Sequence, residues 1–228
     1  MVSKGGYKRE SMVGKVPVGF PYIETLISKE DKQKYGYSIR GSLSPEDQKL
    51  RNKALIVLLY YSARRISELV GRALKLDVGY DFWPGVKVKD FRFDTLKGRD
   101  LVIMNVRILK KGKAKRDSIR KVFREVAMDT HWPLMEHFLI WFEHQKELGP
   151  ETKIFNIKRS RAFQILKALD KKVFNHWLRH QRLSHLGEYL TPFQLNERIG
   201  FWEKLDPAIS YVHGRVSAYL EAGDKVTK

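Results

Sequence analysis

Apolar residues recur at helical spacing in two regions of the chain, on either side of a region with an alternating pattern. The first region opens with Ser44-Pro45-Glu46-Asp47, in which serine suits a helix cap and proline the first helical position. Apolar residues then follow three or four positions apart up to Tyr61. We therefore expect a core-facing helix here, and a second helix that begins within 62–67 and extends to Ala73.

The helical spacing returns after Trp132. One apolar stripe runs from 134 to 142 and ends before Gly149-Pro150, and another runs from 163 to 177 and continues into the next residues. Thr191-Pro192 and Asp206-Pro207 repeat the helix-start signal. These patterns predict at least two long helices and two short ones in this half of the chain.

Between Gly79 and Val122, apolar and polar residues alternate, which is typical of strands with one buried face. The runs 86–89, 91–93, 101–108 and 118–122 predict an antiparallel sheet of about three strands, with a very basic outer hairpin at 110–116. The predicted fold class is mainly α with a small antiparallel β-sheet (α+β). We expect an N-terminal arm or linker at 1–42, with a short helix within 21–34, and a main domain with a C-terminal tail at 43–228.

The charge balance indicates the kind of partner. Lysine and arginine number 44 against 26 acidic residues, a formal net charge of +18, which favours nucleic acid and, as a second choice, an anionic membrane surface. The chain has no cysteine, so disulfides, thiolate metal sites and thiol catalysis are excluded. It has no apolar run that could span a bilayer and no signal-peptide core, so we expect a cytoplasmic, nucleoid-associated protein without a membrane partner. Composition does not separate a DNA enzyme from a basic binding protein.

Several cations are candidates for binding a phosphate. Arg65 and Glu68 suit either an ordinary helix-surface ion pair or an arginine that binds phosphate and is oriented by the acid. The hairpin cations either touch a DNA backbone non-specifically or include one lysine that protonates a leaving oxygen, for which Lys111 is the first choice and Lys110 the second. The other hairpin candidates for DNA contact are Lys113, Lys115 and Arg116.

A second group of candidates follows later in the chain. His176 and His180 have a spacing that can hold a metal, but the arginine between them and the lack of a carboxylate argue against one, so no metal and no cofactor are predicted. His176 equally suits a buried position, whereas Arg179 on the same face needs an anion; His180 is a candidate for DNA contact. Trp and Tyr are more often core residues than site residues, so Trp202 and Tyr211 suit the core as well as a site. A tyrosine attacks phosphorus only where cations stabilise the phenolate and the pentavalent phosphate.

The order of these residues resembles the catalytic domain of the tyrosine recombinases, the integrase family. Six positions match the residues that carry the family's chemistry: Arg65, Lys111, His176, Arg179, Trp202 and Tyr211. Glu68, in Arg-Ile-Ser-Glu-Leu, matches the family's helix acid. The resemblance spans about Leu43 to Tyr219 and is nearest to the integrases of archaeal viruses and plasmids.

Three features depart from the family pattern. Members usually carry an N-terminal core-binding domain, and only the stretch 1–42 precedes the matching region here, so we expect a fragment or a minimal member. Ile199-Gly200-Phe201-Trp202 replaces the usual Leu-Gly-His, and the spacing to Tyr211 favours Trp202 over Phe201 as the matching residue. Arg64 directly precedes the matching arginine, and we expect it to face DNA.

The resemblance implies a site-specific DNA recombinase that needs no metal and no cofactor. It implies that Tyr211 attacks a phosphodiester and forms a 3′-phosphotyrosyl bond, that Arg65 and Arg179 hold the non-bridging oxygens, and that Lys111 protonates the leaving 5′ oxygen. By the same resemblance His176 assists proton transfer, and Trp202 donates a hydrogen bond or packs the site.

The resemblance also implies partners: double-stranded DNA, and four protomers assembled on two DNA sites from a protein that is monomeric when free. Three alternatives stay open: a type IB topoisomerase-like enzyme, a non-catalytic DNA-binding module of the same fold, and a basic RNA-binding protein. The last predicts stacking aromatic residues on an exposed sheet, and no such motif is evident.

Overall fold

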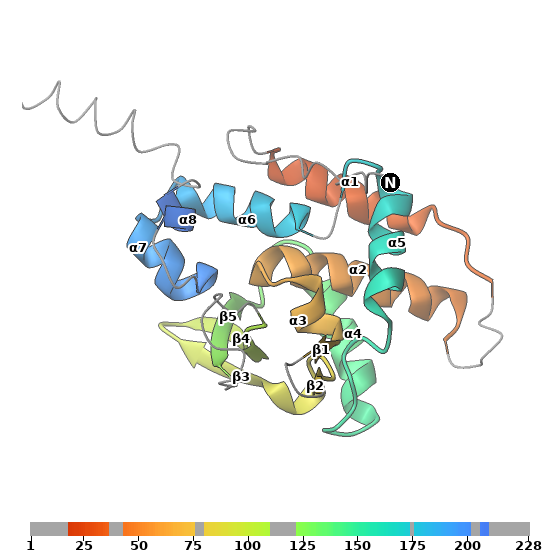
Figure 1. The fold of residues 1–228 in the computed structure, drawn as a ribbon. Helices are drawn as coiled ribbons and strands as arrows, with labels where there is room; N and C mark the ends of the chain where they lie inside the picture. The colour runs from red at the N-terminus through yellow and green to blue at the C-terminus, as the bar shows by residue number, and fades with distance from the viewer. Residues whose placement is uncertain are drawn as a thin grey trace, which may run out of the picture.

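The computed structural model describes residues 18–36, 43–75, 80–109, 122–173, 176–201 and 206–209 (Figure 1). The helices are α1 (Phe20–Asp31), α2 (Pro45–Ser62), α3 (Ile66–Val70), α4 (Met135–Glu147), α5 (Arg159–Leu169), α6 (Trp177–Gly187), α7 (Pro192–Leu195) and α8 (Asp206–Ile209), with a 3₁₀ turn η1 (Val88–Asp90) and a π-helical turn η2 (Asn196–Gly200). The strands are β1 (Arg72–Lys75), β2 (Tyr80–Trp83), β3 (Phe91–Leu96), β4 (Arg99–Arg107) and β5 (Phe123–Asp129). The predicted class, mainly α with a small antiparallel sheet, is confirmed.

Helix α2 is the centre of the fold. It begins as predicted, because the Ser44 hydroxyl accepts a hydrogen bond from the Asp47 amide at 3.0 Å. Every residue from Ala54 to Ser62 is buried, so this half of the helix is covered on all sides rather than along one stripe. Helices α1, α4 and α6 and strand β5 contact it, and Figure 1 shows α1 and α6 along one side of α2 with the sheet on the other.

The predicted short helix in the N-terminal region is found as α1. Its apolar residues Ile23, Leu26 and Ile27 are buried in the same core as α2. The Tyr22 hydroxyl donates to the Asp170 carboxylate at 2.5 Å and so joins α1 to the end of α5. The division of the chain at residue 42 stays a prediction, and α1 shares its core with residues on the other side of that division.

The predicted second helix is shorter than expected. Helix α3 ends at Val70, and Ala73 lies in β1, paired with Phe82. Gly71 follows the helix with a φ of 92°, and a Cβ atom there would lie 2.6 Å from the backbone of Pro84. The close crossing of these two segments therefore ends the helix, and helical periodicity alone did not reveal it.

The predicted sheet forms, with different outer bounds. Strands β3, β4 and β5 pair antiparallel in that order, and the face that includes Val102 and Met128 is buried. The run 86–89 was wrongly predicted as a strand: Lys87 forms one isolated bridge, and η1 follows it. Strand β5 is the last strand in the part of the chain that the structure describes, and of the predicted run 118–122 all but Val122 lies outside the described residues. The pair β1–β2 was not predicted.

The second helical region divides more finely than its apolar stripe suggested. The stripe from 163 to 177 belongs to two helices, since α5 ends at Leu169 and α6 begins at Trp177. Thr191 caps α7, as predicted, by accepting from the Gln194 amide at 3.2 Å. Figure 1 shows α7 and α8 close to the end of α6, on the same side of the fold as the sheet edge. The start of α6 and the end of η2 lie near the C-terminal end of α2, because Arg179 of α6 donates to the carbonyls of both Ala63 and Gly200.

Candidate active site

The candidate site is built on the turn between α2 and α3. Ala63 ends α2 in the left-handed conformation, with a φ of 49°, and Arg65 is the N-cap of α3. The Glu68 carboxylate accepts from the Arg65 amide and from the Arg65 guanidinium, each at 2.9 Å. The ion pair that the spacing suggested therefore forms, and it fixes the Arg65 side chain, which is 18% exposed, at the start of the helix.

Glu68 is fully buried and joins this turn to the sheet. Its Oε1 atom also accepts from the Leu109 amide at 3.3 Å, and its backbone carbonyl accepts from the Trp83 indole at 2.8 Å. Burial acts to raise the pKa of Glu68, but three arginines, Arg64, Arg65 and Arg179, together lower it below its usual value. Glu68 is therefore a carboxylate that faces all three guanidinium groups.

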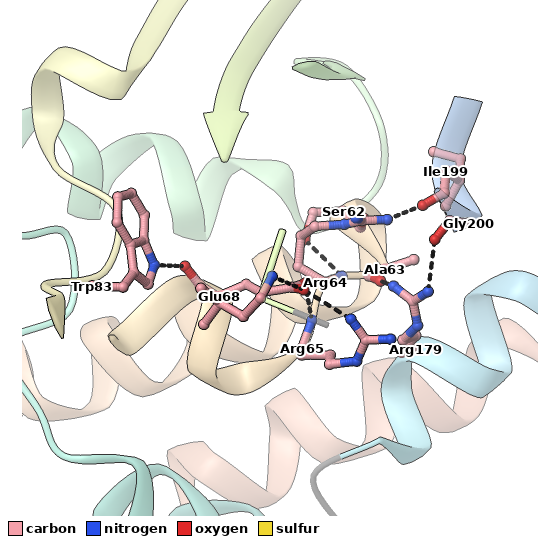
Figure 2. Close-up of polar contacts among 10 residues, drawn as sticks. Ser62, Ala63, Arg64, Arg65, Glu68, Trp83, Arg179, Ile199 and Gly200 are labelled. Carbon is pink, nitrogen blue, oxygen red and sulfur yellow. Dashed lines mark hydrogen bonds and ion pairs between the residues drawn. The ribbon is translucent and has the colours of Figure 1, made fainter. Parts of the chain in front are cut away.

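Arg179 reaches the same turn from α6, more than a hundred positions later in the sequence. Its Nη1 donates to the Ala63 carbonyl and its Nη2 to the Gly200 carbonyl at 3.1 Å (Figure 2). Only 5% of Arg179 is exposed. The sequence-predicted arginines thus meet at one place, although Arg179 is bound to protein carbonyls there.

His176 lies at the N-terminal end of α6, beside the same cations. Burial, followed by the charges of Arg65 and Arg179, lowers the pKa of His176 to about 4. Burial and Arg179 also lower the pKa of His180. At neutral pH His176 is therefore an uncharged imidazole and not a fixed cation, and it is a weaker base than an ordinary histidine because burial and the neighbouring cations oppose its protonation.

Arg64 lies elsewhere than expected. It is 1% exposed, its Nε donates to the Ser62 carbonyl at 2.9 Å, and its Nη2 donates to the Ile199 carbonyl (Figure 2). The guanidinium also lies 4.8 Å from the centre of the Phe201 ring. The expectation that Arg64 faces DNA is therefore wrong for this structure, because the side chain turns inward and its hydrogen bonds are made to protein carbonyls.

The cluster carries more positive than negative charge. Arg64, Arg65 and Arg179 surround one shared carboxylate, Glu68. Among the residues that the structure describes, no group of three or more histidine and acidic side chains could hold a metal ion. Guanidinium groups with excess positive charge bind anions, and a planar guanidinium suits two oxygens of one phosphate. The cluster can therefore neutralise a nearby phosphate, and Arg65, the most exposed of the three, is the one best placed to contact it.

The remaining candidates lie outside the described residues: Lys110, Lys111, Lys113, Lys115, Arg116, Trp202 and Tyr211. Two of these stretches follow directly after residues that contact the site. Leu109, which donates to Glu68, directly precedes Lys110, and Phe201, which contacts Arg64, directly precedes Trp202. The roles predicted for these residues stay predictions.

Sequence reasoning missed two parts of the site. Arg159, in the first turn of α5, acts on the pKa of His176 together with Arg65 and Arg179. The basic run Lys158-Arg159-Ser160-Arg161 could have drawn attention to it. The carbonyls of Ile199 and Gly200 were also missed, and no side-chain pattern could have shown them, because they contribute backbone atoms only.

Comparison with known proteins identifies the fold. No protein-family model matches the chain, and no curated protein matches it. Among solved structures, the XerH site-specific recombinase bound to its difH substrate in a pre-cleavage complex matches with a TM-score of 0.56 and 18% sequence identity, over 90% of this chain and 52% of that one. The fold is that of a tyrosine recombinase catalytic domain.

A second recombinase structure gives the same result. XerH bound to a palindromic difH substrate, in a post-cleavage complex, matches with a TM-score of 0.58 and 17% identity, over 93% of this chain and 54% of that one. The chain therefore spans about half the length of the recombinase chains that it matches.

Within the described ranges, no helix has both the length and the apolar character needed to cross a membrane.

Proposed function

We propose that the chain is a DNA strand-breaking and rejoining enzyme, a site-specific recombinase or integrase of the tyrosine type. One observation carries the proposal: Arg65 and Arg179, from the two motifs that match the family, converge at the α2–α3 turn, with the neutral imidazole of His176 beside them. The recombinase fold supports it, as do the net charge of +18 and the excess positive charge of the site. The DNA complexes named for XerH belong to that protein and suggest double-stranded DNA as the substrate here.

In the proposed reaction, the Tyr211 oxygen attacks a phosphodiester phosphorus, a 3′-phosphotyrosyl bond forms, and the bond to the 5′ oxygen breaks. His176, held uncharged, accepts the tyrosine proton, and Lys111 supplies a proton to the leaving 5′ oxygen. In the reverse reaction a 5′-hydroxyl attacks the phosphotyrosyl phosphorus, the new phosphodiester bond forms, and the bond to Tyr211 breaks as the tyrosine regains its proton. No metal and no cofactor enter the reaction.

The two arginines have different parts in this reaction. Arg65, which is the more exposed, would hold a non-bridging oxygen directly. Arg179 is bound to the carbonyls of Ala63 and Gly200, so a phosphate oxygen would compete with those carbonyls for its donors. Trp202 would donate its indole N–H or pack the site, since it has no acid or base function. Assembly of four protomers on two DNA sites, from a free monomer, belongs to the same proposal.

Covalent trapping on randomised DNA tests the proposal whatever the target site is. The full chain is incubated with nicked duplexes whose flanking sequence is randomised, because the target site is unknown. The nick releases the short fragment that carries the 5′-hydroxyl after cleavage, so the reaction cannot reverse. Denatured samples are then assayed for a protein–DNA adduct, and the attached DNA is sequenced. We expect an adduct in the wild type, none in Tyr211→Phe, and an unchanged amount in Tyr219→Phe.

Other outcomes separate the alternatives. An adduct that persists in Tyr211→Phe and is lost in Tyr219→Phe would assign the nucleophile to the other tyrosine. Relaxation of supercoiled plasmid without any sequence preference in the trapped DNA would indicate a topoisomerase-like enzyme. Salt-dependent DNA binding with no adduct on any duplex would indicate a binding module and overturn the proposed activity.

A further inference from the structure

The segment 196–201 has a costly backbone conformation. Residues Asn196 to Gly200 form a π-helical turn, and the Phe201 amide closes it by donating to the Asn196 carbonyl at 2.7 Å. Phe201 then has a φ of 49°, in the left-handed region that disfavours residues with a side chain. Such turns are rare and persist only where the surroundings hold them, often at functional sites.

Two arginines of the site hold this segment. Arg64 donates to the Ile199 carbonyl, and Arg179 donates to the Gly200 carbonyl at 3.1 Å. These are the last two carbonyls of a helical turn, and such groups lack partners within their own helix. Each arginine also binds a carbonyl at the end of α2, namely that of Ser62 or of Ala63. The two guanidinium groups therefore bridge segments that are far apart in the sequence.

The burial of Arg64 needs an explanation. A buried cation is unfavourable, and both burial and the charge of Arg179 oppose it, lowering the pKa of Arg64 to about 9. A leucine or methionine would occupy the same space without that cost. What arginine adds is a pair of directed donors, to Ser62 and to Ile199, together with a flat cation against the Phe201 ring.

We propose that Arg64 is a positioning residue, which anchors the carbonyl of Ile199 and the ring of Phe201 to the α2–α3 turn and so fixes where the chain leaves the site towards Trp202 and Tyr211. The part of this inference that concerns Tyr211 rests on the proposed function. Arg64 itself touches neither DNA nor the reacting atoms. Its effect on the reaction passes through the segment that leads to the nucleophile.

The test compares Arg64→Met with the wild type, and uses Arg198→Met as the control because Arg198 is an exposed arginine in the same segment. Amide hydrogen exchange is measured on the full chain by mass spectrometry. In Arg64→Met we expect exchange of peptides covering 196–201 to rise at least tenfold, while peptides from the buried half of α2 keep their protection. Arg198→Met should leave both regions unchanged.

The same variants are tested on a nicked duplex that gives an adduct with the wild type. For Arg64→Met we expect at least a tenfold slower adduct formation at saturating DNA, with an unchanged dissociation constant and an unchanged salt dependence of binding. Arg64→Lys is a second variant, which keeps the charge but not the paired donors. It should show the same faster exchange and slower adduct formation.

Several results would overturn the inference. Unchanged exchange in 196–201, or full recovery of protection by Arg64→Lys, would mean that the guanidinium does not anchor the segment. Weaker DNA binding with a smaller salt dependence would mean that Arg64 contacts phosphate after all. If the wild type forms no adduct on any duplex, the proposed function fails, and the exchange data still decide whether Arg64 anchors the segment.

Discussion

His176 is placed so that its burial, and after that the charges around its ring, decide its protonation state. Its ring is partly buried and lies near Arg65, Arg179 and Arg159, which all disfavour the imidazolium form. In the proposed reaction this is useful, because a neutral imidazole can accept the tyrosine proton, whereas a protonated one cannot. Burial and these three cations thus keep the proposed base uncharged in the free protein.

The protonation of His176 should therefore depend on whether a phosphate is present. In the free protein we expect a pKa of about 4, and DNA should raise it, because the phosphate charge offsets that of the arginines and stabilises the imidazolium. NMR titration of the histidine rings measures both states. His131, whose side chain is 75% exposed, is the matched control. An ordinary histidine pKa for His176 in the free protein would contradict the placement.

At the scale of elements, the sequence was informative where the determinants are local. The start of α2 follows from Ser44 and Pro45, and its apolar residues match the helix that forms. The pairing of Arg65 with Glu68 also follows from short spacing. These features depend on residues within one or two helical turns of each other, so they can be predicted without knowing the fold of the rest of the chain.

The same scale shows what the sequence could not reveal. Helix α3 ends at Val70 because Gly71 meets the backbone of Pro84, and α5 and α6 divide one continuous apolar stripe. The position of Arg64 depends on Ile199, which lies in a distant segment. A basic residue beside a predicted phosphate-binding arginine is expected to face DNA. Only the contact with Ile199 shows that Arg64 instead caps the turn formed by residues 196–200.

Glu68 connects three elements, and its removal should affect all of them. Glu68→Gln keeps the size of the side chain but removes the negative charge that the three arginines share. We expect a loss of about 3 kcal/mol in the free energy of unfolding, since the loss of one partner leaves the buried cations uncompensated. Sulfate should restore part of this stability, because an anion that binds the folded state replaces the missing charge.

Thermal and urea unfolding in sodium chloride and in sodium sulfate, at equal ionic strength, measure both effects. Glu125→Gln is the control, because Glu125 pairs with Arg92 on the exposed surface, and it should change neither the stability nor its response to sulfate. A Glu68→Gln protein as stable as the wild type in chloride would show that the carboxylate does not balance the cluster.

At the scale of the whole molecule, fold and charge point to the same class of partner. The described residues adopt a recombinase catalytic fold, and the buried site is positive. Cations also lie on exposed elements near it, such as Arg159 in the first turn of α5, where the helix dipole offers a cation no stabilisation. An anionic backbone that crosses the site would offset the positive charge of both the buried and the exposed cations.

Binding to duplex DNA should therefore be strongly salt-dependent. We expect the affinity to fall by a factor of about 10³ or more between 50 and 200 mM salt, as for proteins that neutralise several phosphates. Arg159→Gln should reduce the slope of log K against log salt by about one, the value for one lost phosphate contact. Arg64→Met should leave the slope unchanged, because that guanidinium is buried. Fluorescence anisotropy with a labelled duplex measures all three slopes, and a wild-type slope near zero would contradict a DNA backbone as the partner.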